Sequence, residues 1–381
     1  MYVDLRNYFF ILRRVLGEET THPRRKKIVW GILLLYPFVA LVDSICFALD
    51  HLLFPGFRRV EVRAPIFVLG NARSGTTHTH RLLAGDGERY AYFRTWEILL
   101  PSLVQKKLVR AIGRIDERFL GGCIAARISG KEDAALGKAR RMHDWRLTGA
   151  EEDGFLSLHT FGSGTLNVIF PYGRELAPLN DLDTLASETH RKRWLDFYEG
   201  CVKRQLYWEG GQRVFLSKNP GFAKKVRSLR ERFPDARFIF PVRHPAETTP
   251  SLVNLLVKGW QAMGCDERDV QDSAEWLRGN QVDAFAHAFE FLDTLPESDY
   301  AVVTFQELVS EPRSAVEEIY ARLGFDISDA YAAFLDEEQR RSRAYESQHR
   351  YDADALGIPR ERVRERLGHL YERFGWPLDE D

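Results

Sequence analysis

The stretch FVLGNARSGTTHTHRLLA, which begins at Phe67, contains a turn whose residue types suit an anionic ligand. It follows the pattern G-x-x-x-x-G, which nucleotide-binding phosphate loops continue with lysine and then serine or threonine. Here Thr76 and Thr77 stand in those two positions, so the loop lysine is missing. Arg73 and Ser74 lie inside the loop, where backbone N–H groups and a helix N-terminus would point at an anion.

The missing lysine narrows the class of anion that the loop can serve. Nucleotidases with such loops neutralise a triphosphate with that lysine and with Mg²⁺, which a loop hydroxyl and an acidic residue hold. No apolar run of this sequence ends in an acidic residue clearly suited to that metal. A sulfonate carries one negative charge, so its transfer requires only arginine, hydroxyls and backbone dipoles. The loop therefore favours a sulfonate donor over a nucleoside triphosphate.

A second segment, RFIFPVRHPAETTPSL, offers a further phosphate contact. Its apolar part predicts a buried strand that ends at Arg243, and Pro245 then breaks the strand. A guanidinium at the carboxyl edge of a sheet can contact a phosphate through two hydrogen bonds. Ser251 follows within two predicted helical turns, so both side chains are candidates for binding the same ligand as the loop.

Together the two segments resemble the donor-binding motifs of sulfotransferases that use 3′-phosphoadenosine 5′-phosphosulfate (PAPS). The Arg-Ser-Gly-Thr-Thr form of the loop is similar to that of the tyrosylprotein sulfotransferases and of many bacterial enzymes. The resemblance implies that Arg243 and Ser251 bind the 3′-phosphate of the donor. It implies that five loop residues bind the 5′-phosphosulfate: Arg73, Ser74, Gly75, Thr76 and Thr77.

This resemblance extends from about Pro65 to Trp376 and leaves out the N-terminal 60 residues. Near the C-terminus, ESQHRYDADALGIP resembles a closing segment of the bacterial family, in which His349, Arg350 and Tyr351 would approach the nucleotide. The main alternative is a kinase or NTPase-like protein with a degenerate loop, which would require ATP and Mg²⁺. A membrane-bound nucleotide sensor without catalytic activity is a third hypothesis.

Lys218, in FLSKNPG, lies 25 residues before Arg243 at the end of a predicted strand. It resembles the lysine that contacts the transferring sulfonate in cytosolic sulfotransferases. In those enzymes a histidine two residues later is the general base, but this sequence has Pro220 there. The resemblance therefore implies that Lys218 stabilises charge on the sulfonate, and that another group removes the proton.

Two acidic positions are candidates for that general base, which must reach the acceptor hydroxyl. Glu97, in FRTWEIL, follows a predicted second strand and resembles in position the glutamate of the tyrosylprotein sulfotransferases. Glu152 and Asp153, in GAEEDGFLS, resemble an acidic trio of many bacterial members. Both alternatives remain open from the sequence.

These residues must be positioned by a parallel sheet. Apolar runs bounded by turn residues predict its strands: 66–70, 213–217, 237–242 and 300–305. Helical patterns follow the runs, which indicates an α/β, P-loop NTPase-like fold with the ligand at the carboxyl ends of the strands. We expect an N-terminal segment over 1–60 and a sulfotransferase domain over 61–381, with a mostly helical insertion over 100–210.

The composition excludes several classes of site. The chain has 54 Lys+Arg and 55 Asp+Glu, so its net charge indicates no nucleic-acid-binding surface. Its four cysteines stand far apart, and none has a partner at metal-ligand spacing. We therefore expect neither a metal site nor a disulfide framework.

The N-terminal segment combines a basic cluster, Arg24 to Lys27, with a mostly apolar stretch over 28–54. A membrane span needs about 20 predominantly apolar residues, and this stretch nearly qualifies. Asp43 would be costly in a bilayer, and Pro37 would kink a helix. Three interpretations remain: a single span, a re-entrant or surface-lying helical hairpin hinged near Pro37, and a buried packing helix.

The apolar segment favours an acceptor that partitions into membranes, such as a lipid or a sterol-like alcohol. A spanning segment would keep its basic cluster in the cytosol and place the rest of the chain on the other side, as in a Golgi-type lumen. PAPS would then need a transporter, whereas a hairpin in the cytosolic leaflet would lie beside its donor. The chain has no N-x-[ST] sequon, which favours a membrane-associated protein that faces the cytoplasm.

Overall fold

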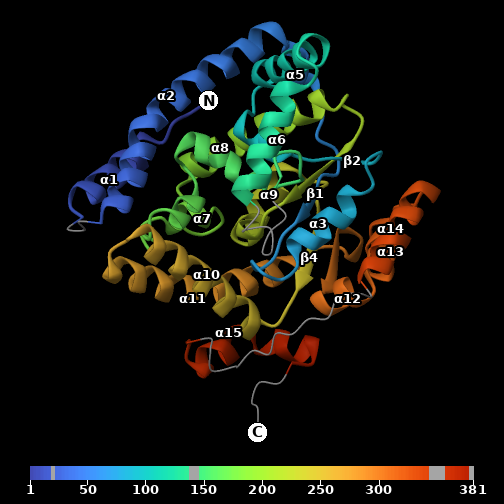
Figure 1. Ribbon diagram of the computed structural model, residues 1–381. Helices are drawn as coiled ribbons and strands as arrows, with labels where there is room; N and C mark the ends of the chain where they lie inside the picture. The colour runs from blue at the N-terminus through green and yellow to red at the C-terminus, as the bar shows by residue number, and fades with distance from the viewer. Residues whose placement is uncertain (19–21, 137–145, 343–356, 377–381) are drawn as a thin grey trace.

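Five apolar runs form one parallel sheet in the computed structural model, which describes residues 1–18, 22–136, 146–342 and 357–376 (Figure 1). The strands are β1 (Ile66–Val68), β2 (Tyr90–Ala91), β3 (Val214–Lys218), β4 (Arg237–Val242) and β5 (Tyr300–Thr304). Their order across the sheet is β2-β3-β1-β4-β5, and every neighbouring pair is parallel. The predicted α/β fold and its four predicted strands are confirmed.

Both faces of the sheet are covered because its side chains alternate between two cores. On β1, Phe67 joins one buried apolar cluster while Ile66 and Val68 join the other. The first cluster includes side chains of α8, α9, α11 and α15, and the second includes side chains of α3, α13 and α14. Such two-sided burial is expected of a parallel sheet.

The helices flank and extend this sheet (Figure 1). The α-helices are α1 (Leu5–Leu16), α2 (Pro23–Leu53), α3 (Thr76–Ala84), α4 (Thr95–Leu99), α5 (Leu103–Phe119), α6 (Cys123–Leu136), α7 (Ala177–Asn180), α8 (Glu188–Trp208), α9 (Val226–Arg232), α10 (Pro245–Met263), α11 (Glu267–Leu292), α12 (Phe305–Ser310), α13 (Pro312–Leu323), α14 (Asp329–Ser342) and α15 (Arg360–Phe374). The 3₁₀ helices are η1 (Pro55–Arg59), η2 (Asp153–Thr160), η3 (Gly164–Val168), η4 (Pro220–Lys225) and η5 (Glu297–Asp299). The insertion predicted over 100–210 is built mainly from α5, α6 and α8.

The apolar N-terminal segment forms one continuous helix, α2, so the predicted hairpin hinged near Pro37 is wrong. Proline cannot donate the backbone hydrogen bond that the carbonyl of Leu33 would otherwise accept. The Tyr8 hydroxyl of α1 donates to that carbonyl instead, at 2.9 Å. The helix therefore passes Pro37 with the carbonyl left by the proline satisfied.

The two aspartates of α2, Asp43 and Asp50, are buried against the rest of the protein. Asp43 accepts a hydrogen bond from Gln105 Nε2 at 2.8 Å, and His159 Nδ1 lies 2.7 Å from its other oxygen. Asp50 is fully buried and accepts from the backbone N–H groups of Leu103 and Val104, the first residues of α5. It also forms an ion pair with buried Arg204, whose Nε lies 2.7 Å away. Asp43 and Asp50, the two charged residues within the apolar stretch, thus anchor α2 to α5 and α8.

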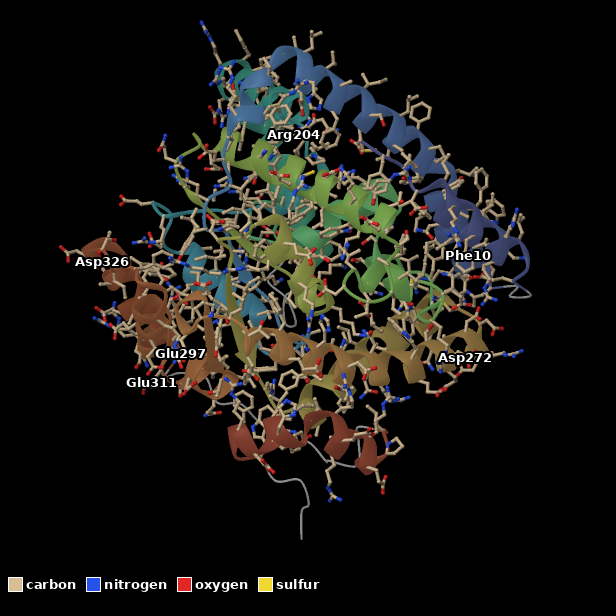
Figure 2. The ribbon with its side chains drawn as sticks, turned by 180° about the vertical axis from the view of Figure 1, so that it is seen from behind. Phe10, Arg204, Asp272, Glu297, Glu311 and Asp326 are labelled. Carbon is tan, nitrogen blue, oxygen red and sulfur yellow. The ribbon has the colours of Figure 1, made fainter. Side chains whose placement is uncertain are left out.

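Asp50→Ala is expected to lower the free energy of unfolding by about 3–5 kcal/mol, because it leaves the buried Arg204 guanidinium without its carboxylate. Chemical denaturation followed by circular dichroism measures this change. Asp272→Ala is the matched control, since Asp272 is an exposed residue of α11 that Figure 2 places on the outside of the molecule, far from Arg204. Equal stability of the two variants would contradict the anchoring role of Asp50.

Candidate active site

The loop after β1 is curled by two residues with left-handed backbone. Arg73 has a φ of 75° and Gly75 a φ of 98°, and Gly75 is the residue before the first turn of α3. A Cβ atom at Gly75 would also lie 3.0 Å from the Phe305 ring. The backbone therefore requires glycine there, and its curl suits the binding of an anion by successive N–H groups.

Several buried polar atoms of this loop and of α10, the helix that carries Ser251, lack a hydrogen-bond partner among the described residues. They are Ser74 Oγ, Asn71 Oδ1 and Nδ2, and Thr249 Oγ1 of α10. These residues are at most 2 % exposed. Buried polar groups are nearly always paired in native proteins, so an unpaired group calls for an explanation such as a ligand. Phosphate or sulfonate oxygens could accept hydrogen bonds from Asn71 Nδ2 and the hydroxyl groups, whereas Asn71 Oδ1 can only accept one.

The two predicted donor motifs meet in space. Arg73 Nε donates a hydrogen bond to Ser251 Oγ at 3.2 Å, across 178 residues of sequence. This contact is possible because β4, which leads to α10, lies directly beside β1. The structure thus brings the loop and the strand–helix motif together, as the sequence predicts.

Arg243, at the end of β4, is held by two groups that the sequence analysis missed. Its Nε donates to Glu247 Oε2 at 2.7 Å, and its guanidinium lies 4.2 Å from the centroid of the Phe305 ring. Phe305 directly follows β5, so its position at the end of a predicted strand was a usable signal. Glu247 stands one helical turn after Arg243, which is the spacing of an ordinary helical ion pair.

Lys218 is the last residue of β3 and forms ion pairs within the acidic trio, which consists of Glu151, Glu152 and Asp153. Its Nζ lies 2.8 Å from Glu152 Oε1 and 3.7 Å from Glu151 Oε1, and the residue is only 2 % exposed. The trio is held in place by its backbone, since the N–H of Glu151 donates to the carbonyl of Phe93 at 3.0 Å. Gly154 packs directly on Asn219, which follows Lys218. The acidic segment is therefore fixed at the carboxyl ends of β2 and β3.

Asp153 is buried beside this ion pair. The Tyr198 hydroxyl lies 2.5 Å from Asp153 Oδ2 and 3.2 Å from Ser217 Oγ, while Asp153 Oδ1 has no partner among the described residues. Burial raises the pKa of Asp153 to about 7, although its hydrogen bonds with Tyr198 and Ser217 oppose the rise. The nearby Glu152 raises this pKa further and Lys218 lowers it. A carboxylate whose pKa lies near neutral pH suits the role of a general base.

Glu97 has a different environment from the acidic trio. It is fully buried and accepts a hydrogen bond from the backbone N–H of Arg94 at 2.9 Å, which closes a capping box at the start of α4. Its other hydrogen bonds come from the Arg94 side chain and from Gln205 of α8. These hydrogen bonds hold α4 against α8. The side chains of Glu152 and Asp153, in contrast, contact residues at the end of β3.

His80, in the helix that follows the loop, is a packing residue. It is buried in α3, and burial followed by the charge of Lys218 lowers its pKa to about 3, so its ring is neutral. His349, Arg350 and Tyr351 lie outside the described residues.

Comparison with known proteins identifies a family from the sequence and finds the same fold in solved structures. A model described as "Sulfotransferase family" matches residues 65–329, well over half of the chain. The omega-hydroxy-beta-dihydromenaquinone-9 sulfotransferases Stf3 of Mycobacterium bovis and Mycobacterium tuberculosis are each 24 % identical over 360 residues, which cover 91 % of this chain and 84 % of theirs.

Two solved structures share the fold. Sulfotransferase STF9 from Mycobacterium avium superposes with a TM-score of 0.69 at 15 % identity, over 100 % of this chain and 99 % of the other. Sulfotransferase STF1 from Mycobacterium tuberculosis gives 0.64 at 16 % identity, over 96 % and 92 %. The family expected from the two donor motifs is confirmed, and the chain belongs to the sulfotransferase family.

Proposed function

We propose that this sulfotransferase uses PAPS as its donor and transfers the sulfonate to the hydroxyl group of an apolar, lipid-like alcohol. The contact between Arg73 and Ser251 carries the donor assignment, because it joins the two motifs that would bind opposite ends of the donor. The buried atoms of Asn71 and Ser74 that lack a partner among the described residues support it further, since both residues belong to this loop.

The donor would be bound by two groups of residues. The loop residues would bind the 5′-phosphosulfate: Arg73, Ser74, Gly75, Thr76 and Thr77. Arg243 and Ser251 would bind the 3′-phosphate. Arg243 now pairs with Glu247, so the phosphate would compete with or share this guanidinium, which Phe305 holds in position.

The transfer would proceed by in-line attack of the acceptor oxygen on the sulfur. The bond between sulfur and the phosphate oxygen breaks, which releases 3′,5′-adenosine bisphosphate and a sulfate ester. Lys218 would stabilise the charge that develops on the transferring group and the leaving oxygen. The arginine, lysine and backbone donors supply the positive charge that this step requires, so we propose that it needs no metal.

The proton of the acceptor hydroxyl would pass to the acidic trio, and we assign it to Asp153. Its Oδ1 atom is unpaired and its pKa is about 7, whereas Glu152 is engaged by Lys218. Glu97 is the alternative base, but its carboxylate is occupied in the cap of α4. We interpret Glu97 as a structural residue.

The proposed class of acceptor rests on the Stf3 relatives and on the apolar helix α2. The Stf3 relatives are named for omega-hydroxy-beta-dihydromenaquinone-9, a hydroxylated menaquinone, and we propose an apolar alcohol of that kind for this chain. Among the described helices, α2 is long and apolar enough to cross a membrane. We propose that it associates with the membrane and that the site faces the cytoplasm, where PAPS is made; a Golgi-type lumen is the alternative.

Calorimetry tests the donor site. We expect 3′,5′-adenosine bisphosphate to bind in the presence of EDTA, and Arg243→Ala to raise its Kd at least about tenfold because a charged phosphate contact is lost. Arg313→Ala is the matched control, since Arg313 also pairs with a glutamate one helical turn on, yet lies in α13. Binding of ATP that is tighter and requires Mg²⁺ would contradict the proposal and favour the NTPase-like alternative.

A further inference from the structure

Helix α5 exposes an apolar stripe that no described part of the chain covers. Leu108, Ile112, Ile115 and Phe119 are 58 %, 44 %, 53 % and 70 % exposed. Their spacing of four, three and four residues places them on one side of the helix. A surface helix ordinarily buries such a stripe against its own protein, so this one lacks its partner.

The exposed charges of α5 and α2 are almost all basic. On α5 the exposed charged residues are Lys107, Arg110, Arg114, Glu117 and Arg118, which flank the stripe itself. On α2 they are Arg24, Lys26 and Lys27, in the first turns of the helix and away from the part that packs on α5, since Arg25, Asp43 and Asp50 are buried. The net charge of the whole chain is −1, so this concentration of positive charge is local.

The neighbouring helix α2 is apolar on its outer side as well. Its most exposed apolar residues are Leu34, Leu35, Phe38, Leu41, Ile45, Leu52 and Leu53. It packs against the beginning of α5 through the contacts of Asp43 with Gln105 and of Asp50 with Leu103. Figure 1 shows the two helices side by side at one end of the molecule, with the outer side of α2 turned away from the sheet. Two adjacent helices thus leave apolar side chains uncovered.

We infer that α2 and α5 form a docking surface for an anionic lipid bilayer, on which the protein lies without crossing it. The apolar side chains would enter the boundary between headgroups and acyl chains, while the basic side chains would bind lipid phosphates. This combination of an apolar stripe and a basic flank is typical of helices that lie in the plane of a membrane.

Crossing the bilayer is inconsistent with how α2 packs. Its inner side is buried at intervals of three, four or seven residues: Val29, Leu33, Ala40, Asp43, Phe47 and Asp50. A transmembrane position would therefore pull the polar groups that hold Asp43 and Asp50 into the hydrocarbon. Lying flat keeps these contacts in the protein and both helix ends in the headgroup region.

A second copy of this chain is a poorer occupant of the surface. Joining two such surfaces would bring their basic residues together, and like charges across an interface are unfavourable. An anionic bilayer provides the opposite charge. This inference rests on α2 and α5 alone and does not depend on the proposed donor or acceptor.

Flotation of the full-length protein with lipid vesicles tests the surface. We compare vesicles of phosphatidylcholine alone with vesicles containing about one-third phosphatidylglycerol, where basic residues near the surface each add to binding. The wild-type protein should bind the anionic vesicles at least about tenfold more tightly, and Ile112→Asp/Phe119→Asp should remove at least about tenfold of that binding. Leu185→Asp, at an apolar position 53 % exposed outside α2 and α5, should change it little.

Three outcomes would overturn the inference. In the first, the double variant Ile112→Asp/Phe119→Asp, called the α5 variant, binds vesicles as tightly as wild type. In the second, the wild-type protein binds both types of vesicle equally. In the third, the bound protein resists extraction at alkaline pH, as a spanning protein does. A concentration-dependent dimer that the α5 variant abolishes, without vesicle binding, would assign the surface to a second copy instead. The α5 variant is shown to be folded if it binds 3′,5′-adenosine bisphosphate as the wild type does. If the wild type binds no bisphosphate, an unchanged circular dichroism spectrum serves the same purpose.

Discussion

Replacing Lys218 by alanine is expected to lower kcat for sulfonate transfer by about 10²–10³, which is the usual cost of removing one positioned donor from a developing charge. Lys218 is fixed for this task, because it ends β3, is 2 % exposed and is held 2.8 Å from Glu152. The rate of single-turnover transfer from PAPS measures the effect directly. The KM for the acceptor should change little, since the interaction strengthens only in the transition state.

Lys192→Ala is the matched control for this experiment. Lys192 also pairs with a carboxylate, Asp196, at 2.8 Å, but its side chain is 73 % exposed on α8. It should leave kcat unchanged. A Lys218→Ala variant that binds the bisphosphate normally and transfers sulfonate at the wild-type rate would contradict the role of this lysine.

Asp153→Asn is expected to lower kcat by about 10²–10⁴, the usual contribution of a general base. The wild-type enzyme should also lose kcat/KM as the pH falls below about 7, because protonated Asp153 cannot accept the proton of the hydroxyl. The sign follows from the raised pKa: the active, charged form of this carboxylate predominates only above that pH. The pH profile of kcat/KM measures both the direction and the midpoint.

Glu97→Gln and Asp272→Asn separate this role from other effects. Glu97→Gln weakens the cap of α4 and its contacts with Arg94, so it should lower stability and leave the pH profile in place. The exposed Asp272 should have no effect in either measurement. If Glu97→Gln abolished transfer in a folded protein while Asp153→Asn retained it, the base would be Glu97. If Glu152→Gln were the most damaging change, the base would be Glu152.

The strands and the donor motifs could be predicted because their signals are local. The run RFIFPV is apolar and bounded by charged residues, and β4 occupies the same residues, Arg237–Val242. Arg73 and Ser251 belong to motifs whose order along the chain already indicates a shared ligand. The sequence predicts a second strand before Glu97 without bounds, because β2 has only two residues, Tyr90 and Ala91.

The rest depends on contacts between distant residues. In the sequence Asp50 is a charged residue within an apolar stretch. Its ion-pair partner Arg204 lies 154 residues away, so the pair could not be predicted. The Tyr8 hydroxyl that lets α2 continue through Pro37 belongs to another helix. Glu97 and Asp153 are acidic residues of the same general kind in the sequence. Only their neighbours, the cap of α4 in one case and Tyr198 with Lys218 in the other, distinguish the carboxylate that we interpret as structural from the one that we propose as the base.

The unpaired side chains around the loop could not have been found from the sequence either. Asn71 lies inside the loop motif and Thr249 lies two residues before Ser251, so both positions were close to predicted residues. Their significance is that they are buried without partners, which is a property of packing. Asn71 and Thr249 thus add buried donors beside the predicted residues of the two motifs, which the motifs alone do not reveal.

The most direct test of the account is transfer of radiolabelled sulfonate from PAPS to a long-chain apolar alcohol in anionic vesicles, with EDTA present. The account predicts that label passes into the organic phase with the wild-type protein, and at a rate about 10²–10³ lower with Lys218→Ala. No transfer by protein that binds the bisphosphate, or incorporation from labelled ATP that requires Mg²⁺, would contradict it.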